Sequence, residues 1–434
     1  MSARMAGHSG IVSAPRRLDP AAPDLSGLIH PGDHILWGQV TGEPPTLVEA
    51  LVDQRAALGP VSVFLGTGLG RALRPEHADH IRMSGLGGLG TARALASAGA
   101  LEVLPVHGGQ VGWLIAEGRI RCDVVLLMAS PAGPEGTHSL GCTVDYMDTA
   151  IAAARTVIAE VSPRVPFTFG HEAIPASRLD AVLETDRAPF GARPPKIGAA
   201  GRAIATHVAE LIADGSTIQT GLGELPEAIL EGLGGHRDLG LHSGILGDAA
   251  RTLIERGVLT NARKPIDTGI SVTTTVVGSE ALYAFVHRNP GVLVRPSGYT
   301  HADAVLAQIP RLVAINSAVE VDLTGQVNAE QAGRAIVGGI GGQADFARAA
   351  SRSPGGCSII ALPATASNGA SRIVARLSGP VTTPRADVDV VVTEHGAADL
   401  RGCTLGERRR RLVAIAAPEA REALERATRE EETG

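Results

Sequence analysis

Glycine clusters carry the strongest chemical signal in this chain of 434 residues. Glycine occurs 54 times, and it gathers at Gly66–Gly70, Gly85–Gly90, Gly221–Gly223 and Gly338–Gly342. A glycine lets the backbone approach a ligand closely and presents its N–H group without a Cβ in the way. The chemistry that such loops offer is therefore the binding of anionic or partly charged oxygen atoms.

The segment Gly85–Gly90 formally fits the G-x-G-x-x-G pattern of dinucleotide-binding loops. The acidic residue that should follow about 20 positions later is Glu102, but it precedes an apolar run instead of ending one. Ordinary turn glycines explain this segment better than a nicotinamide site does.

The other two clusters each precede a helical pattern, at Gln219–Pro226 and at Gly338–Gln343. A glycine loop at a helix N-terminus binds phosphates or carboxylates through its free N–H groups. Two successive glycine N–H groups can also form an oxyanion hole for a carbonyl under attack. Glycine placement alone leaves a tight turn and a binding site as open alternatives.

The composition narrows the class of protein. The chain has 45 acidic and 39 basic residues, without a basic stripe, and 3% aromatic residues, so we expect no nucleic-acid partner. No apolar stretch approaches the roughly 20 residues that cross a membrane. The four cysteines, which lie far apart, predict neither a disulfide framework nor a metal site and fit a soluble protein of the reducing cytoplasm.

Short apolar runs alternate with helical patterns after an Arg-, Ala- and Pro-rich start. In the first half we expect helices at Leu47–Leu58 and Thr149–Val161 and strands at Val61–Leu65, Leu101–Val106 and Val124–Met128. The second half predicts helices at Arg202–Asp214, Pro226–Leu233 and within Leu405–Arg429, and strands at Ile270–Val277, Leu312–Ile315, Ser358–Leu362 and Val388–Val392. This alternation is typical of open α/β sheets.

The length exceeds what one core usually supports, so two α/β domains are expected. The Pro- and Arg-rich stretch Arg187–Lys196 is the candidate linker. We expect a disordered tail over residues 1–25, an N-terminal α/β domain over 26–190 and a C-terminal α/β domain over 195–434.

Four long segments of the chain, Gly221–Pro226, Val313–Asn328, Gly339–Phe346 and Val391–Gly402, form specific motifs in order. They resemble a G-[IV]-G-x-[IL]-P loop, a V-A-I-N-S-A-x-E-V-D-L-x-G-Q-V-N segment, a G-x-G-G-Q-x-D-F loop and a V-V-T-E-[YH]-G-x-A-x-L-R-G turn. These four motifs belong to the acetyl-CoA hydrolase/transferase family, of the 4-hydroxybutyrate CoA-transferase type. The segment Asp123–Gly141 matches the family more loosely. The resemblance covers nearly the whole chain after its first residues.

The resemblance implies two open α/β domains of the CoA-transferase type with the active site in the cleft between them. It implies coenzyme A or a small acyl-CoA, with a carboxylate, as substrate, no permanently bound cofactor, no metal, and a homodimer or larger homo-oligomer. Residue by residue, it assigns the binding of the CoA thioester to Gly221, Leu222, Gly223, Asn316, Gly339, Gly341, Gly342 and Gln343.

The same resemblance exposes a missing nucleophile. In the family a glutamate in H-[ST]-E-[ML]-x-x-D attacks the thioester and carries CoA as a glutamyl thioester. Here that motif reads His242-Ser243-Gly244, so the glutamate position holds Gly244, and no residue from Leu241 to Gly247 is a glutamate. The expected acyl-CoA enzyme must therefore work by an atypical mechanism.

Three neighbours are candidates to replace the carboxylate. His242 could act as a general base toward water, Ser243 lies beside the vacant position without the spacing of a nucleophile elbow, and Glu224 in the glycine loop could be a displaced carboxylate. Asp248 is close in sequence but is expected to be structural.

The missing glutamate leaves three interpretations of the function. The first is a CoA-transferase or acyl-CoA hydrolase. The second is a lyase or decarboxylase that uses the oxyanion hole to stabilise a thioester enolate. The third is a non-catalytic acyl-CoA-binding paralogue. The run Arg295–Thr300 also departs from the family's usual P-V-x-x-x-N, which implies an altered substrate.

Overall fold

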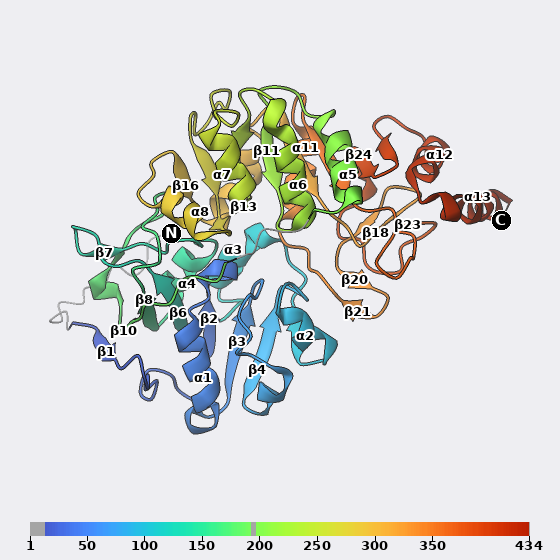
Figure 1. The fold of residues 1–434 in the computed structure, drawn as a ribbon. Helices are drawn as coiled ribbons and strands as arrows, with labels where there is room; N and C mark the ends of the chain where they lie inside the picture. The colour runs from blue at the N-terminus through green and yellow to red at the C-terminus, as the bar shows by residue number, and fades with distance from the viewer. Residues whose placement is uncertain (1–13, 192–196, 434) are drawn as a thin grey trace.

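The computed structural model describes residues 14–191 and 197–433 as two layered α/β units (Figure 1). The first unit, drawn in blue to green, is built on an eight-stranded sheet in the order β1-β10-β8-β6-β2-β3-β4-β5. All its neighbouring strands run parallel. The strands are β1 (Arg16–Leu18), β10 (Ala181–Glu184), β8 (Thr156–Val161), β6 (Val124–Ala129), β2 (His34–Trp37), β3 (Val61–Leu65), β4 (Ile81–Gly85) and β5 (Leu101–Val103).

The helices of the first unit are short except for one. They are α1 (Pro45–Leu58), α2 (Ala92–Ser97), α3 (Val111–Ala116) and α4 (Met147–Ala153). Helix α1 starts at a proline, whose missing N–H group costs nothing at the first helical position, and it stops at Gly59, which has a φ of +81°.

The second unit contains a six-stranded sheet in the order β12-β11-β17-β22-β24-β25, in which only β25 is antiparallel to its neighbour. Its strands are β12 (Gly240–Leu241), β11 (Thr217–Thr220), β17 (Leu312–Asn316), β22 (Cys357–Ala361), β24 (Val390–Thr393) and β25 (Gly396–Asp399). Its helices are α5 (Ala199–Ala209), α6 (Glu224–Gly232), α7 (Asp248–Glu255), α8 (Glu280–Val286), α9 (Ser297–Thr300), α10 (Asp303–Leu306), α11 (Gln343–Arg352), α12 (Leu405–Ile415) and α13 (Pro418–Thr433).

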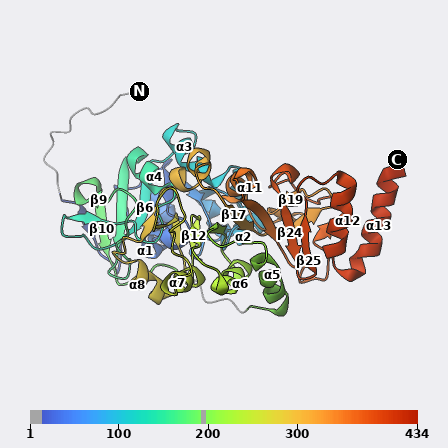
Figure 2. The same ribbon diagram turned by 90° about the horizontal axis from the view of Figure 1, so that it is seen from above.

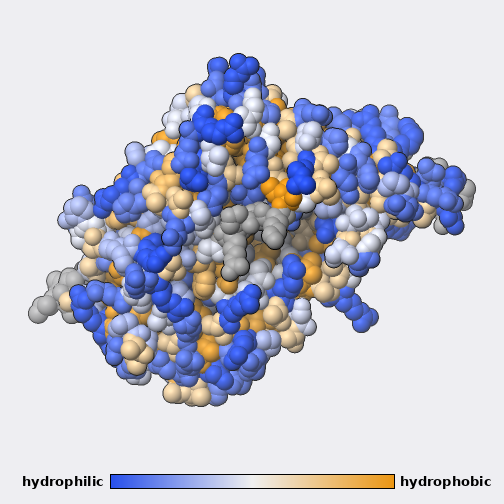
Figure 3. Space-filling model, in the orientation of Figure 1, coloured by the Kyte–Doolittle hydropathy of each residue, from blue (hydrophilic) through white to orange (hydrophobic). Residues whose placement is uncertain are grey.

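Helices cover both faces of the second sheet, as the near-continuous apolar strands require. Figure 2 shows α11 on one side of β17 and α5 to α7 on the other. Helices α12 and α13 lie at the end of this unit, and hydrophilic residues predominate around them on the face shown in Figure 3. None of the helices within residues 14–191 and 197–433 has the length and apolar character that crossing a membrane requires.

Four strand pairs and one group of three strands lie outside the two large sheets of the described residues. They are β7 (Thr137–His138) with β9 (Ile174–Pro175), β13 (Ile245–Leu246) with β15 (Thr275–Val276), β14 (Ser271–Thr273) with β16 (Val292–Val294), β18 (Glu320–Asp322) with β19 (Val327–Asn328) and β23 (Ile373–Val374), and β20 (Gln331–Ala332) with β21 (Ala335–Ile336).

The two units share one hydrophobic core and a seam of backbone hydrogen bonds. A single cluster of buried side chains includes Leu127 of β6 and Ile359 of β22. Across the seam, Val144 N donates to Thr274 O at 3.1 Å. Because core and backbone are both continuous there, loops from the two units are held in fixed contact.

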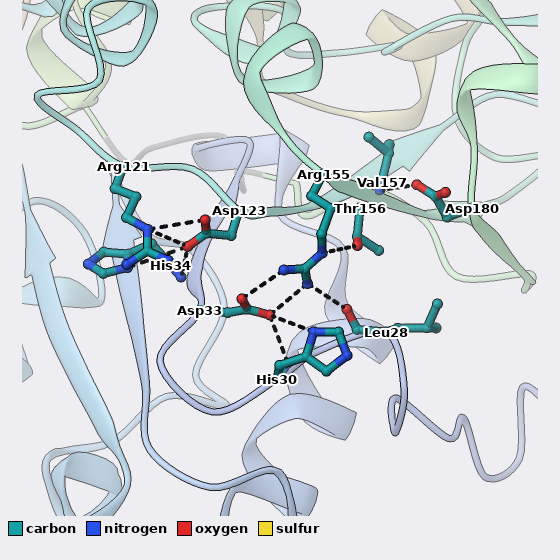
Figure 4. A network of polar contacts seen from close by, with 10 residues as sticks. All are labelled: Leu28, His30, Asp33, His34, Arg121, Asp123, Arg155, Thr156, Val157 and Asp180. Atoms are coloured by element: carbon teal, nitrogen blue, oxygen red, sulfur yellow. Dashed lines mark hydrogen bonds and ion pairs between the residues drawn. The ribbon is translucent and has the colours of Figure 1, made fainter. Parts of the chain in front are cut away.

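A polar network closes the amino-terminal edge of the first sheet (Figure 4). The guanidinium of Arg155 donates to the Asp33 carboxylate at 3.1 and 2.9 Å, and His30 N donates to Asp33 at 2.7 Å. The neighbouring Asp123 accepts from His34 N at 2.8 Å and pairs with Arg121 at 2.9 Å. The Arg155–Asp33 bonds therefore join the starts of β8 and β2, and the His34–Asp123 bond joins the starts of β2 and β6.

Most expected elements are confirmed, but three predictions are wrong in part. The expected helix Thr149–Val161 ends at Ala153, and Thr156–Val161 is the buried strand β8, because its β-branched residues pair with both β6 and β10. The expected strand Ile270–Val277 is two strands, β14 and β15, in different sheets.

The disordered tail was predicted to extend to residue 25, and for residues 14–25 this is wrong. Strand β1 pairs with β10 at the edge of the first sheet, and Leu25 is fully buried. Residues 1–13 and 192–196, which include part of the expected tail and linker, lie outside the described residues.

Candidate active site

Gly244, where the resemblance predicts the nucleophile, lies at the carboxyl edge of the second sheet. His242 and Ser243 follow β12 directly, and both are fully buried. Ser243 Oγ donates to Thr220 O at 2.9 Å and accepts from Thr220 N at 3.2 Å. Because Thr220 ends β11, these bonds bring Gly244 beside the start of the Gly221–Gly223 loop.

His242 has one bonded and one unbonded ring nitrogen, because its buried Nδ1 has no hydrogen-bond partner among the described residues. Its Nε2 donates to Thr300 O at 3.0 Å, and burial, followed by the nearby charge of Lys264, lowers the pKa of His242 to about 4. The ring is therefore neutral at neutral pH and fixes the backbone at the end of α9.

His301, which follows α9 immediately, stands between two of the glycines. A Cβ placed on Gly244 would lie 3.4 Å from His301 Nε2, and a Cβ on Gly342 would collide with the same nitrogen. The Phe346 ring meets the imidazole edge to face at 4.8 Å. Gly109 of the first unit completes the enclosure, because a Cβ there would come within 2.8 Å of His301 Cβ.

The nitrogen atoms of His301 have different surroundings. Nδ1 lies 2.8 Å from Thr300 Oγ1, whereas Nε2 has no hydrogen-bond partner among the described residues. The ring keeps partial contact with solvent, yet its burial, together with the charge of His242, lowers the pKa of His301 to about 4. At neutral pH the site therefore holds a neutral imidazole with one unused nitrogen.

The Gly338–Gly342 loop is clamped through its carbonyl groups by the first unit. Gly88 N donates to Gly338 O at 2.9 Å, and Gly108 N donates to Gly341 O at 2.7 Å. Among the described residues the Gly342 N–H group has no acceptor, whereas the backbone of Gly341 pairs with His107 in a parallel β-bridge. A Cβ on Gly341 would meet nothing within 4 Å. The loop thus offers one free donor, the Gly342 N–H group, of the kind that an oxyanion hole requires.

This clamp explains the G-x-G-x-x-G pattern. A Cβ on Gly87 would collide with Gly338 O, and one on Gly88 would collide with Ile336 O. These glycines allow two backbone segments to pack against each other, which agrees with the reading of this segment as ordinary glycines.

A histidine–aspartate pair joins the two units beside this loop. His107 Nδ1 lies 3.3 Å from Asp345 Oδ1, and Gly109 N donates to Asp345 Oδ2 at 3.3 Å. Burial raises the pKa of Asp345 to about 6, although the adjacent His107 opposes the rise. Asp345 lies in the first turn of α11, so it holds the helix that carries Phe346 against the first unit.

The remaining predicted residues lie around the site with other partners. Asn316 and Gln219 form a buried reciprocal amide pair at 3.3 and 3.1 Å, and Gln343 Nε2 donates to Thr383 Oγ1 at 3.1 Å. Glu224 is exposed and accepts from Gly198 N at 2.8 Å. These side chains tie loops together, whereas Gly244, Gly342 and His301 meet directly.

The other residues that the sequence predicted for the site differ in how much open space surrounds them. Leu222 is 44% exposed, a Cβ on Gly221 would meet nothing within 4 Å, and Gly223 has a φ of +134°. Gly339 instead packs against Leu86, because a Cβ on it would collide with the Leu86 carbonyl oxygen. Asp248 accepts from Ser279 N at 2.8 Å and from Ser279 Oγ at 2.6 Å, so its carboxylate caps the chain before α8.

Sequence reasoning missed His301, His107 and Asp345 as parts of the site. One signal could have pointed to His301. When the family's P-V-x-x-x-N run is aligned so that its proline is Pro296, its asparagine falls on His301. The His107–Asp345 contact joins distant segments, and no local pattern marks it.

Comparison with known protein families agrees with this architecture. The acetyl-CoA hydrolase/transferase N-terminal domain matches residues 19–191, and the C-terminal domain of the same name matches residues 278–428. The chain belongs to the acetyl-CoA hydrolase/transferase family, and the prediction of that family is confirmed.

Similar proteins match almost end to end. The 4-hydroxybutyrate coenzyme A transferase of Clostridium kluyveri is 37% identical over 90% of this chain and 92% of its own length. The succinyl-CoA:cyclohexane-1-carboxylate CoA transferase of Geobacter metallireducens is 33% identical over 94% of each chain. The crystal structure of RipA from Yersinia pestis superposes with a TM-score of 0.90 at 33% identity, covering 96% of this chain and 98% of that one. The α/β fold with parallel sheets is thereby confirmed.

Proposed function

We propose that this protein hydrolyses small acyl-CoA thioesters and does not carry CoA on a glutamyl side chain. Two observations support the proposal: the retained glycine loop has a free N–H group at Gly342, and the predicted nucleophile position, Gly244, has no side chain. Oxyanion stabilisation and substrate binding survive the loss of a nucleophile in enzymes that have both.

The proposed reaction needs only water and the thioester. The water oxygen bonds to the thioester carbon, and the carbonyl electrons move to the oxygen that the Gly342 N–H group stabilises. The carbonyl then re-forms, the carbon–sulfur bond breaks, and the thiolate takes up the proton that the water gave up. An acyl-CoA and water become a carboxylic acid and free CoA.

The substrate of this proposal is a short acyl group. Acetyl-CoA, butyryl-CoA and 4-hydroxybutyryl-CoA are the first substrates to test, because the similar proteins include a 4-hydroxybutyrate coenzyme A transferase. The departure of Arg295–Thr300 from the family run supports an acyl preference that differs from that relative's.

The test measures thiol release from each thioester with and without added acetate, and searches for a covalent CoA adduct after borohydride or hydroxylamine treatment. We expect release that does not depend on acetate, and no trapped glutamate. Fast ping-pong transfer to acetate, with CoA attached to another carboxylate such as Glu224, would contradict the proposal. So would exchange of the α-hydrogens of acetyl-CoA with solvent deuterium without hydrolysis, which would indicate enolate chemistry.

We also propose that the chain divides into domains at the Pro-rich stretch, with residues 26–190 and 195–434 as the units, and that it assembles as a homodimer or larger homo-oligomer. The support for the division is that every strand of the first sheet precedes residue 191 and every strand of the second follows residue 197. Limited proteolysis should cut first near this stretch, and sedimentation velocity should show a mass above 44.5 kDa.

A further inference from the structure

We propose that His301 is the base that activates the attacking water, in the space that a glutamate side chain at position 244 would occupy. This inference rests on the proposed hydrolysis and names the residue that performs its proton transfer. Nothing in the family assignment gives His301 this role, since the nucleophile position of the resemblance is Gly244.

The first argument is position. His301 Nε2 lies 3.4 Å from a Cβ built on Gly244, and His301 Cε1 lies 3.5 Å from it. These are ordinary contact distances, so a glutamate side chain at position 244 would begin directly against the ring. His301 Nε2 therefore lies beside the position that a carboxylate-bearing side chain would start from, and Gly342 lies next to the same nitrogen.

The second argument is that the ring is oriented and its free nitrogen is unused. Thr300 Oγ1 is placed to donate to Pro296 O at 3.5 Å and so to accept from His301 Nδ1 at 2.8 Å. With the proton on Nδ1, Nε2 carries the lone pair, as a general base requires. Phe346 packs against the ring and limits its rotation.

The third argument is that a network of buried contacts fixes the segment that carries His301. His242 Nε2 donates to Thr300 O at 3.0 Å, and Ser297 N donates to Asp145 O of the first unit at 2.9 Å. Tyr299 OH donates to Asp267 at 2.8 Å, and the Arg295 guanidinium lies 4.3 Å from the centre of the Tyr299 ring. A base must be held within hydrogen-bond reach of its water, and these contacts supply that restraint.

The groups around the ring leave it unprotonated at neutral pH, so that its Nε2 lone pair is available. His242 on one side is itself neutral, since burial lowers its pKa to about 4. On the side of Gly109, Asp345 and His107 form the pair that joins the two units. The neutral ring takes the water proton through Nε2 as the oxygen attacks, and returns it to the departing thiolate.

The experiment compares thiol release by the full-length protein and by His301→Ala, His301→Gln and His301→Asn. The loss of a positioned base lowers kcat about 10²–10⁴-fold while KM for the acyl-CoA changes little. Added imidazole should restore part of the activity of His301→Ala in proportion to its neutral form, which a purely structural role would not give. The matched control is His80→Asn, a partly exposed histidine at the end of the 3-10 helix Pro75–Asp79, whose activity should equal that of the unmodified protein.

The outcomes separate this inference from the proposed function. No thiol release by the unmodified protein from any acyl-CoA contradicts the proposed function itself. Release by the unmodified protein that stays within threefold in all His301 variants overturns only the role of His301. A loss without imidazole rescue, or an acyl group found covalently bound to His301, also overturns the role of a base. His301→Asn keeps an amide that can bond Thr300, so it decides the question if His301→Ala does not fold.

A double variant tests the shared space directly. Gly244→Glu alone places its Cβ in contact with His301, which restricts the new carboxylate, so we expect little transfer to acetate. Gly244→Glu combined with His301→Asn removes the ring and should produce CoA transfer with a trappable glutamyl thioester. Transfer by the single variant equal to that of the double variant would show that His301 does not occupy this volume, and would overturn the inference.

Discussion

Two sheet edges in this molecule use polar residues in opposite ways. At the amino-terminal edge of the first sheet, Asp33 accepts from Arg155, and Asp123 accepts from His34 N and pairs with Arg121 (Figure 4). At the carboxyl edge of the second sheet, Gly342 N and His301 Nε2 have no partner among the described residues. Satisfied groups stabilise the fold, whereas unsatisfied donors and acceptors are available to a ligand.

The same contrast holds for glycine. Gly87 and Gly88 are glycines because any Cβ would strike the backbone of the opposite loop. Gly341 faces open space, so its lack of a side chain leaves room for something that is not protein. A glycine-rich pattern in a sequence therefore mixes packing positions with binding positions, and only the surroundings separate them.

The largest effect should follow Gly342→Ala. The new Cβ would collide with His301 Nε2 and Cδ2, displacing the proposed base and disturbing an oxyanion donor, which together should lower kcat roughly 10³-fold or more. Gly201→Ala in α5 is the control, because a Cβ there lies an ordinary 3.5 Å from Ile197. If Gly342→Ala hydrolyses acyl-CoA as fast as Gly201→Ala, the carboxyl edge is not the reacting site.

A smaller loss is expected from Gly341→Ala. The added methyl group meets no protein atom within 4 Å, so it would instead narrow the space offered to the thioester and lower kcat/KM roughly 10–100-fold. Gly341 has a φ of +54°, and a side chain there also strains the backbone. Gly99→Ala, with a φ of +71° and nothing within 4 Å, carries the same strain far from the loop. Equal activity of the two variants would mean that Gly341 does not face the substrate.

Substitutions at the amino-terminal edge of the first sheet should change the stability of the protein and not its activity. Asp33 is 5% exposed and its partner Arg155 is 48% exposed, so Asp33→Ala should lower the free energy of unfolding by about 1–3 kcal/mol and leave kcat unchanged. Asp79→Ala, which breaks the solvent-exposed pair with Arg55, should have a much smaller effect on urea unfolding. A clear loss of kcat for Asp33→Ala, measured where the variant is still folded, would show that the two edges are linked.

The pH dependence of that stability has a defined sign. Burial alone would raise the pKa of Asp33, but the hydrogen bonds from Arg155 and His30 lower it below the ordinary 3.8. The contribution of Asp33 is therefore present above pH 3.8 and is lost as the pH falls through the lowered pKa. The difference in stability between the unmodified protein and Asp33→Ala should shrink only in that acid range.

The sequence predicted the fold class and the family because both depend on local patterns. Apolar runs such as Val61–Leu65 are strands in any parallel sheet, and long motifs such as Val313–Asn328 survive residue by residue. The error at Thr149–Val161 has a physical cause. An alanine-rich pattern continued into Thr156–Val161, and only pairing with β6 and β10 decides that this stretch is a strand.

The candidate site was predictable only in part. The glycine at position 244 was visible in the sequence, and so was the glycine loop at 338–342. The approach of His301 to Gly244 depends on the packing of α9, and the His107–Asp345 pair depends on the contact of two units. Such long-range proximity leaves no periodic or spacing signal in one sequence.

The smallest expected effect is the pH dependence of hydrolysis near neutrality, and it distinguishes His301 from the nearby carboxylates. Burial and the charge of His242 lower the pKa of His301 to about 4, so the base is already neutral at pH 6 and gains nothing at pH 8. The value of kcat/KM should therefore change less than about twofold between pH 6 and 8 and should fall as the pH drops toward 4. Burial raises the pKa of Asp345 and of Asp145 to about 6, so an inflection near pH 6 would assign the proton transfer to one of these carboxylates instead of the imidazole. The profile of His301→Gln provides the comparison, because its residual activity should not fall as the pH drops toward 4 if His301 is the group that titrates.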